Sequence, residues 1–347
     1  MSVAAPHSPP MAVARHGVGR RAATAGLLGV LVVSLMLGVP ALQPVVREIR
    51  DMNPWWVGGG VALELASCVS YVVLFRLFFD RVAAPDARAL AWTSMASGVL
   101  LPGGGVGALA IGGWLMHLTG APVRWIVRRS SGIFFLTSAV NGAAIIGAGM
   151  LLLGGSSGPH DFARAGLPLL AAALITLLIV AAPWAQPRLG GRAGSPWVAG
   201  IVEGIRDAER AGRHPSWRLL GALGYLGFDI AVLWATFSAI GHAPPVAALM
   251  LGYTIGYVAN ALPVPGGIGV LDAGLAAALV LYGAQPADAA AAVLVYHAIA
   301  LWLPAAGGLL AYVRLRPRLA PGVGDPPVTH DPPVTHTSNP ALEGCLP

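Results

Sequence analysis

Long apolar runs, separated by arginine, proline and glycine, dominate the chain. A helix that crosses a bilayer needs about 20 apolar residues. Five uninterrupted runs meet this requirement, and they are Pro54–Phe79, Ser130–Leu153, Gly166–Trp184, Trp217–Ile240 and Asp288–Val313. Helices that are apolar on every face are typical of membrane spans. We therefore predict an all-α polytopic membrane protein.

A sixth apolar run lies near the N-terminus. Residues 1–21 are polar and end in arginine, and a charge-free run follows from Ala22 to Val46. The pattern resembles a secretory signal, and the small residues Val39-Pro40-Ala41 leave cleavage open as an alternative. Because the run is longer than a usual signal core of ~7–15 residues, we interpret it as a retained first helix after a cytoplasmic segment.

Two further apolar stretches are interrupted in the middle. Ala87–Leu118 contains Pro102-Gly103-Gly104-Gly105, and Val246–Tyr282 contains Pro263-Val264-Pro265-Gly266-Gly267. Proline and successive glycines break helices, so each stretch is predicted to form two half-helices. Irregular backbone at membrane depth needs protein or a water-filled cavity around it, which favours a re-entrant hairpin. Two short complete helices joined by an external turn are the alternative.

The arginines indicate one orientation. With the N-terminus inside, 18 of the 21 basic residues, all arginine, fall in cytoplasmic segments, and only Arg47, Arg50 and Arg164 fall outside. The positive-inside rule then predicts that both termini are cytoplasmic. We expect a multi-pass protein of the plasma (inner) membrane. This placement also explains the pI of about 9.9 without nucleic-acid binding. The segment from Arg188 to Pro215 is predicted as an amphipathic surface helix, with a solvated linker as the alternative.

Composition excludes several classes of protein. Hydrophobic residues make up 56% of the chain and charged residues 10%, too few charges for a soluble domain. The cysteines Cys68 and Cys345 are isolated, which excludes a disulfide framework. Catalytic and phosphate-binding motifs are absent, so we predict no cofactor and no metal and lean against an enzyme. Residues 314–347 contain a Pro-rich repeat and are predicted to be a disordered cytoplasmic tail.

The chain contains a weak internal repeat. A shift of 163 residues places Pro102-Gly103-Gly104 on Pro265-Gly266-Gly267, and a shift of 165 places Glu64 on Asp229. The transmembrane domain, residues 22–313, then divides into repeat 1 (about 22–153) and repeat 2 (about 166–313). Each repeat has an odd number of net crossings, so the two copies are predicted to be inverted. The tips of the two broken hairpins would meet near the midplane.

Acidic residues at membrane depth are the candidates for chemistry, because inserting one costs ~2.5–3.5 kcal/mol. The candidate substrate cavity contains Glu64, Asp229, Asn260, Asp272, Tyr296 and His297, with Tyr257 and Asn141 as further polar lining. A structural hydrogen bond is the alternative for Glu64 and Asp229, and for His297 it is the favoured interpretation. The predicted hinge residues are Pro102, Gly103, Gly104, Pro263, Pro265, Gly266 and Gly267.

Three segments carry a resemblance to a known family. They resemble the transmembrane domain of the lysylphosphatidylglycerol synthase family and are Leu262-Pro-Val-Pro-Gly-Gly-Ile-Gly-Val-Leu-Asp272, Gly283-Ala-Gln-Pro286 and Tyr296-His-Ala-Ile-Ala-Leu-Trp-Leu-Pro304. The likeness extends over roughly Pro54 to Val313. The family pattern usually has Glu where this chain has Asp272 and Arg where it has His297. In bifunctional relatives this domain is a lipid flippase, and a separate C-terminal domain makes the lipid.

The resemblance implies a stand-alone bacterial flippase-like protein without the synthase domain. We therefore expect a translocator of a lipid or of a lipid-linked headgroup, with anionic and aminoacylated lipids as candidate partners. A non-transporting lipid-binding partner of a separate membrane synthase or glycosyltransferase is the alternative. An intramembrane enzyme that uses Asp272 and His297 is the third hypothesis. The oligomeric state is not predicted.

Overall fold

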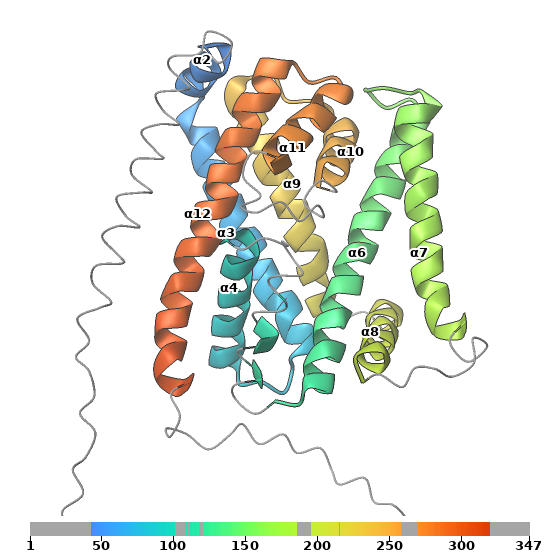
Figure 1. The fold of residues 1–347 in the computed structure, drawn as a ribbon. Helices are drawn as coiled ribbons and strands as arrows, with labels where there is room; N and C mark the ends of the chain where they lie inside the picture. The colour runs from blue at the N-terminus through green and yellow to red at the C-terminus, as the bar shows by residue number, and fades with distance from the viewer. Residues whose placement is uncertain are drawn as a thin grey trace, which may run out of the picture.

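The computed structural model describes residues 43–100, 109, 112–114, 116–117, 121–185, 196–214, 216–257 and 270–319. These residues form helices joined by turns and contain no strand (Figure 1). The long helices are α3 (Pro54–Phe78), α6 (Val123–Leu153), α7 (Leu167–Ala185), α9 (Leu220–Ile240) and α12 (Pro286–Leu319). The shorter elements are α2 (Gln43–Asp51), α4 (Ala84–Leu100), η2 (Phe162–Gly166), α8 (Pro196–Arg213), η3 (Trp217–Leu219), α10 (Val246–Gly256) and α11 (Val270–Leu281).

The five predicted membrane spans are confirmed as helices. Each of α3, α6, α7 with η2, α9 with η3, and α12 is long and apolar enough to cross a membrane. The protein is therefore an all-α, multi-pass membrane protein. The predicted sixth run falls mostly outside the described residues, and its last residues, Gln43 to Val46, begin the separate helix α2.

Two helix boundaries differ from the sequence prediction. Helix α6 begins at Val123, before the predicted Ser130, and so includes three arginines in its first two turns. This is possible because Arg124 and Arg128 pair with Glu203 and Asp207 of α8. Helix α12 likewise continues beyond the predicted end, through three further arginines, to Leu319.

Helices α3 and α9 form an antiparallel pair. At one end the Asn53 N–H donates to the Ala239 carbonyl at 2.9 Å, and at the other the Arg218 Nη1 donates to the Arg76 carbonyl at 3.1 Å. Gly221 allows the two backbones to touch, because a Cβ there would lie 2.7 Å from the Leu74 nitrogen. Close contact through small residues is typical of helix packing in membranes.

The first half of each interrupted stretch is a short helix, as predicted. Helix α4 packs against α12, and helix α10, of 11 residues, packs against α11 and α6. In Figure 1, α4 lies toward the end of the bundle that holds α8, and α10 and α11 lie toward the end that holds α2. The breaks themselves, with all seven predicted hinge residues, lie outside the described residues, so the re-entrant hairpins stay a prediction.

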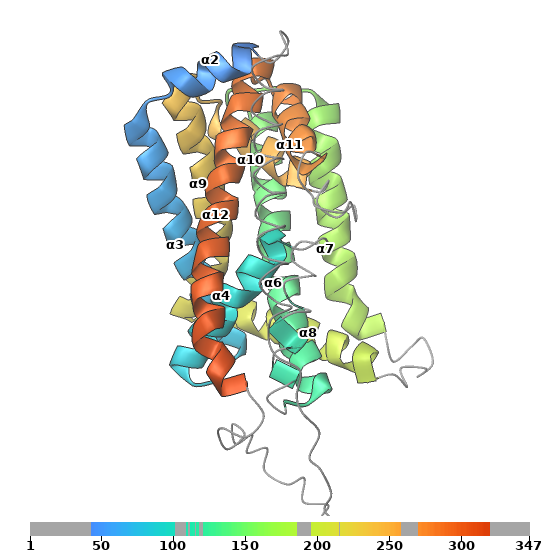
Figure 2. The ribbon, with the colours of Figure 1, turned by 60° about the vertical axis from the view of Figure 1, so that its left-hand side comes forward.

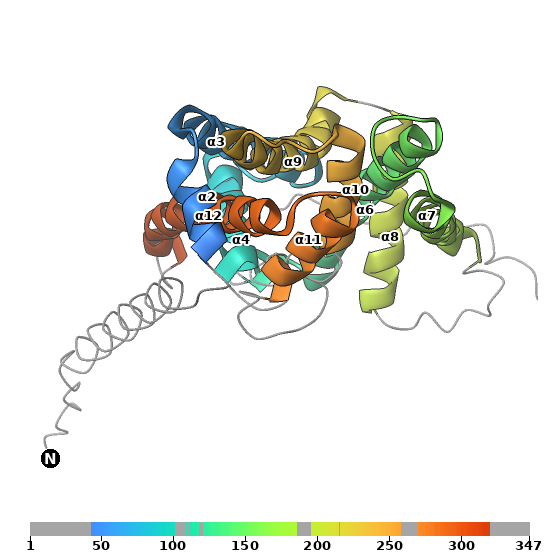
Figure 3. The same ribbon diagram turned by 90° about the horizontal axis from the view of Figure 1, so that it is seen from above.

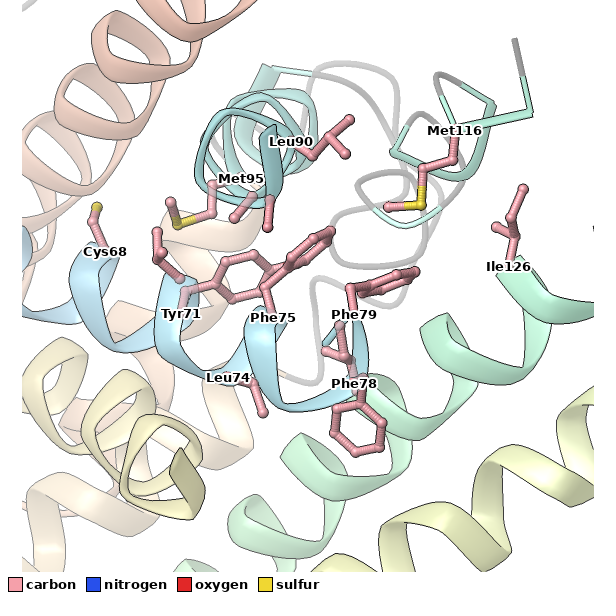
Figure 4. Close-up of a cluster of buried hydrophobic side chains, with 14 of the residues drawn as sticks. Cys68, Tyr71, Leu74, Phe75, Phe78, Phe79, Leu90, Met95, Met116 and Ile126 are labelled. Carbon is pink, nitrogen blue, oxygen red and sulfur yellow. The ribbon is translucent and has the colours of Figure 1, made fainter. Parts of the chain in front are cut away.

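A cluster of aromatic side chains fills the bundle near its α8 end. Figure 4 shows Tyr71 and Phe75 of α3 on the side of the helix where Leu90 and Met95 of α4 lie, and Phe79, directly after α3, near Met116. The Phe75 and Phe79 rings stack with their centroids 4.4 Å apart. This core fixes α3 against α4 and α6, and α3 carries the first of the predicted acidic residues.

Helix α8 lies across one end of the bundle (Figure 2), and α7 lies at its outer edge (Figure 3). Within the segment predicted to be an amphipathic helix, residues Pro196 to Arg213 are helical. Asp207 is buried and accepts from Arg128 Nε at 2.6 Å and from Arg210 Nη1 at 3.0 Å. These ion pairs attach α8 to the first two turns of α6.

The α3–α9 contact predicts a sharp difference between two glycines on α9. Gly221→Ala places a methyl group against the α3 backbone and should lower the stability of the detergent-solubilised protein by about 1–3 kcal/mol. Gly227→Ala is the matched control, because no atom lies within 4 Å of its added Cβ. Thermal unfolding curves of the two variants should differ in midpoint; equal midpoints would contradict the close packing.

Candidate buried carboxyl site

Two acidic side chains meet where α3 and α9 pack. Glu64 is only 4% exposed, and its carboxyl group interacts electrostatically with that of Asp229. Asp229 accepts hydrogen bonds from the Tyr253 hydroxyl of α10 and, at 3.0 Å, from the Tyr296 hydroxyl of α12. We call Glu64, Asp229, Tyr253 and Tyr296 the carboxyl cluster. It joins four helices from both halves of the chain.

Glu64 has an incomplete set of partners. Its Oε1 lies 3.6 Å from the Cys68 thiol, which donates to it from one turn further along α3. Its Oε2 is buried and has no hydrogen-bond partner among the described residues. A buried carboxyl oxygen without a partner is costly. Glu64 is thus the least satisfied member of the cluster.

The face of α3 that carries Glu64 consists of small residues. Gly60 lies against α9 and α12, and the Ser67 hydroxyl donates to the Tyr225 carbonyl of α9 at 3.1 Å. Positions 60, 64, 67 and 68 share one helix face by their three- and four-residue spacing. The same face that holds α3 against α9 therefore directs Glu64 into the interface.

A second polar pair lies on α11 and α12. The Nδ1 atom of His297 is 2.9 Å from Oδ1 of Asp272, which lies in the first turn of α11. His297 directly follows Tyr296, so neighbouring positions of α12 serve the carboxyl cluster and this second pair. The other ring nitrogen, Nε2, is buried and has no hydrogen-bond partner within the described parts of the chain.

The structure groups most of the predicted cavity residues into these two places. Glu64, Asp229 and Tyr296 meet in the carboxyl cluster, and Asp272 meets His297. Tyr257 follows α10 and stacks on Tyr253, with ring centroids 5.3 Å apart. Asn260 lies outside the described residues. Asn141 is exposed and lines a groove along α6 instead.

Two cluster contacts were missed in the sequence. Cys68 lies one turn after Glu64, and Tyr253 lies one turn before Tyr257. This i, i+4 spacing next to a predicted site residue was a signal that could have found both. The spacing shows only that the side chains share a face; which helix that face meets depends on the packing.

Two apolar hollows flank α6. One, of about 380 Å³, lies between α6, α7 and α8. Its lining is mainly apolar and also includes the polar residues Asn141, Thr176 and Glu209. The other, of about 670 Å³, lies beside the first half of α6 and includes Trp114 and His117. We call them the α6–α7 groove and the α6 pocket. Their apolar walls suit hydrocarbon chains.

Comparison with known protein families identifies the family of this chain. Residues 26–308 match the family described as the lysylphosphatidylglycerol synthase TM region. The chain belongs to this family. The matched region contains the carboxyl cluster, the Asp272–His297 pair, four of the five spans and most of the fifth, and the match confirms the resemblance seen in the sequence. No curated protein matches the chain.

The hydrogen bonds to Asp229 predict that substitutions of Tyr253 and Asp229 have non-additive effects on the free energy of unfolding. Tyr253→Phe removes one buried donor to a carboxyl group and should lower the free energy of unfolding by about 1.5–3 kcal/mol. The cost should shrink when Asp229→Ala is already present, because the acceptor is gone. Thermal or denaturant unfolding of the four-member cycle checks this.

Tyr312→Phe is the control for the cycle, because Tyr312 lies on the same helix as Tyr296 and is 41% exposed. It should change stability by no more than about 0.5 kcal/mol. Additive effects of Tyr253→Phe and Asp229→Ala would show that the tyrosine does not serve the carboxyl group.

Proposed function

We propose that this protein is a translocator of a lipid or of a lipid-linked headgroup across the cell membrane. The carboxyl cluster is the observation that carries the proposal. Acidic residues within membrane spans are rare, and those present face cavities, partners or transport pathways. Here two of them lie together, supported by tyrosines from α10 and α12.

The arrangement of the helices supports inverted repeats. Helices α3 and α9, which carry the two acids, are antiparallel. Helix α4 packs on α12, and helix α10 packs on α6, so the first half-helix of each interrupted stretch contacts the last helix of the other half. Inverted repeats joined by broken helices are the architecture of many secondary transporters. We propose that the two interrupted stretches are re-entrant hairpins whose tips enclose the carboxyl cluster.

Headgroup and acyl chains would occupy different parts of this structure. The Asp272–His297 pair offers hydrogen-bonding groups to a polar headgroup, and the buried Nε2 of His297 has no partner among the described residues to compete for it. The apolar α6–α7 groove and α6 pocket offer space for the acyl chains. Anionic and aminoacylated lipids remain the candidate classes.

The Asp272–His297 pair also favours one second candidate, an intramembrane enzyme. A carboxylate that orients one imidazole nitrogen and leaves the other available is the arrangement of a general base. Translocation and catalysis are separated by chemical analysis of the lipid after incubation. An enzyme changes the lipid, a translocator moves it unchanged, and a lipid-binding accessory protein does neither.

Transport in liposomes tests the proposed function. Purified protein should move headgroup-labelled lipids from one leaflet of the vesicle to the other. The panel of labelled lipids contains anionic, aminoacylated and polyprenyl-linked lipids. His297→Ala should lower the initial rate by at least about tenfold if it removes one charge-assisted headgroup contact of about 1.5–3 kcal/mol. No headgroup movement across the whole panel would refute translocation.

Asp288→Asn is the matched control for this experiment. Asp288 is also buried and also pairs with a histidine, His242, at 3.2 Å, but at the start of α12. The variant should transport at the wild-type rate. An equal loss in His297→Ala and Asp288→Asn would indicate general damage and remove the support for a headgroup site.

We further propose that both chain termini are cytoplasmic, with a cytoplasmic segment (1–21), a transmembrane domain (22–313) and a cytoplasmic tail (314–347). The α8 end is then the inner end. In a Cys345→Ser background, where the remaining Cys68 is buried, single cysteines report the orientation. An impermeant maleimide should label Asp51→Cys in intact cells and Gly212→Cys only after permeabilisation. The opposite pattern would reverse the topology.

A further inference from the structure

Glu64 lies within the bundle without a positive partner among the described residues. It is 4% exposed, and within the described parts of the chain its Oε1 accepts from the Cys68 thiol alone and its Oε2 has no partner. The carboxyl group of Asp229 interacts with that of Glu64, unfavourably when both are ionised. A partner that neutralises the negative charge of the two carboxylates would stabilise the α3–α9 interface.

The helices around Glu64 place acidic and phenolic side chains near it. Their arginine and histidine side chains lie farther along the helices or pair with other residues. On α3 the nearest base, Arg76, is 12 residues away, or ~18 Å along the helix. On α12, His297 pairs with Asp272. The ionisable groups that interact with the Glu64–Asp229 pair are Cys68 of α3, Tyr225 of α9, Tyr253 of α10, Tyr257 after it, and Tyr296 of α12.

The other packed elements hold their charges at the ends of the bundle. Helix α4 carries its charges, Asp86 and Arg88, within its first five residues. Helix α6 carries its arginines in its first two turns, where two of them pair with α8. In η3, Arg218 donates to the Arg76 carbonyl at the end of α3. The described residues therefore offer Glu64 no basic side chain as a neutralising partner.

We propose that Glu64 and Asp229 together form a proton-binding site that couples movement of the transported lipid to the proton gradient. One proton neutralises one of the two carboxyls, so the charge of the pair changes from minus two to minus one. The proton makes Glu64 a carboxylic acid whose hydroxyl oxygen, Oε2, becomes a donor. This coupling rests on the proposed transport function, whereas the proton site itself does not.

In this proposal the proton enters the pair from the Asp229 side. Asp229 is partly exposed, whereas Glu64 is buried behind it. A hydronium ion would give its proton to the Asp229 carboxylate and leave as water, and Asp229 would then pass the proton to Glu64. The reverse order would release the proton to water on the other side of the membrane, after the helices have moved to open the pair to that side. The singly protonated pair favours close packing of α3 on α9, and the doubly ionised pair favours hydration of the two carboxylates.

Infrared difference spectroscopy tests the proton site independently of transport. Spectra of the full-length protein in lipid, recorded in acidic against alkaline buffer, should contain the carbonyl band of a protonated carboxyl group. Glu64→Gln should remove the band; the amide keeps an oxygen acceptor for Cys68, so the fold should be retained. Asp288→Asn should leave the band in place. A spectrum without any Glu64-dependent band would overturn the proton site.

A pH gradient tests the coupling. In sealed liposomes of phosphatidylethanolamine and phosphatidylglycerol, with the membrane potential clamped at zero, labelled phosphatidylglycerol is followed between leaflets. One proton per lipid permits about tenfold accumulation for each pH unit of gradient. We expect this asymmetry in wild type and an equal distribution in Glu64→Gln. If the wild-type protein moves the lipid but distributes it equally between the leaflets despite the pH gradient, the proposed coupling is wrong.

The two experiments separate the failures of the two proposals. If the protein moves no lipid but shows the Glu64-dependent band, translocation is refuted and the proton site stands. If lipid moves but the band is missing, translocation stands and the proton site is refuted.

Discussion

Hydrocarbon offers a carboxyl group neither water nor counter-ions, and this constraint shapes the structure around the α3–α9 pair. A buried acid in a bilayer has to be hydrogen-bonded, neutralised or placed next to a hydrated cavity. Asp229 receives two tyrosine hydroxyls, whereas Glu64 receives one weak thiol donor. The position of α10 and α12 follows from this requirement, because each contributes one of those tyrosines.

Close helix contact makes the arrangement possible. Gly221 brings the α9 backbone against α3, and Gly60 leaves room on α3 for side chains of both α9 and α12. The acids are thereby held in an interface and kept away from the lipid. Outside this centre, α7 packs mainly on α6 and α8, and its exposed leucines suit contact with acyl chains. The structure thus combines a tightly packed polar centre with a loosely packed apolar edge.

The sequence predicted the spans well because the bilayer imposes one simple requirement, about 20 apolar residues in a row. It also located Glu64 and Asp229, because an acid in such a run stands out. It predicted too late a start for α6, because the pairing of Arg124 and Arg128 with α8 is a tertiary contact. Tyr253 was missed for a similar reason: its role depends on how α10 is rotated toward α9.

The central claim is that the Asp272–His297 pair, beside the carboxyl cluster, receives the lipid headgroup. A cryo-electron microscopy map of the protein in lipid nanodiscs, with the transported lipid added, tests this most directly. The account predicts headgroup density that contacts His297 and reaches toward Asp229, with acyl chains leading to the hollows beside α6. Headgroup density restricted to the membrane surface, with the carboxyl cluster sealed from it, would contradict the account.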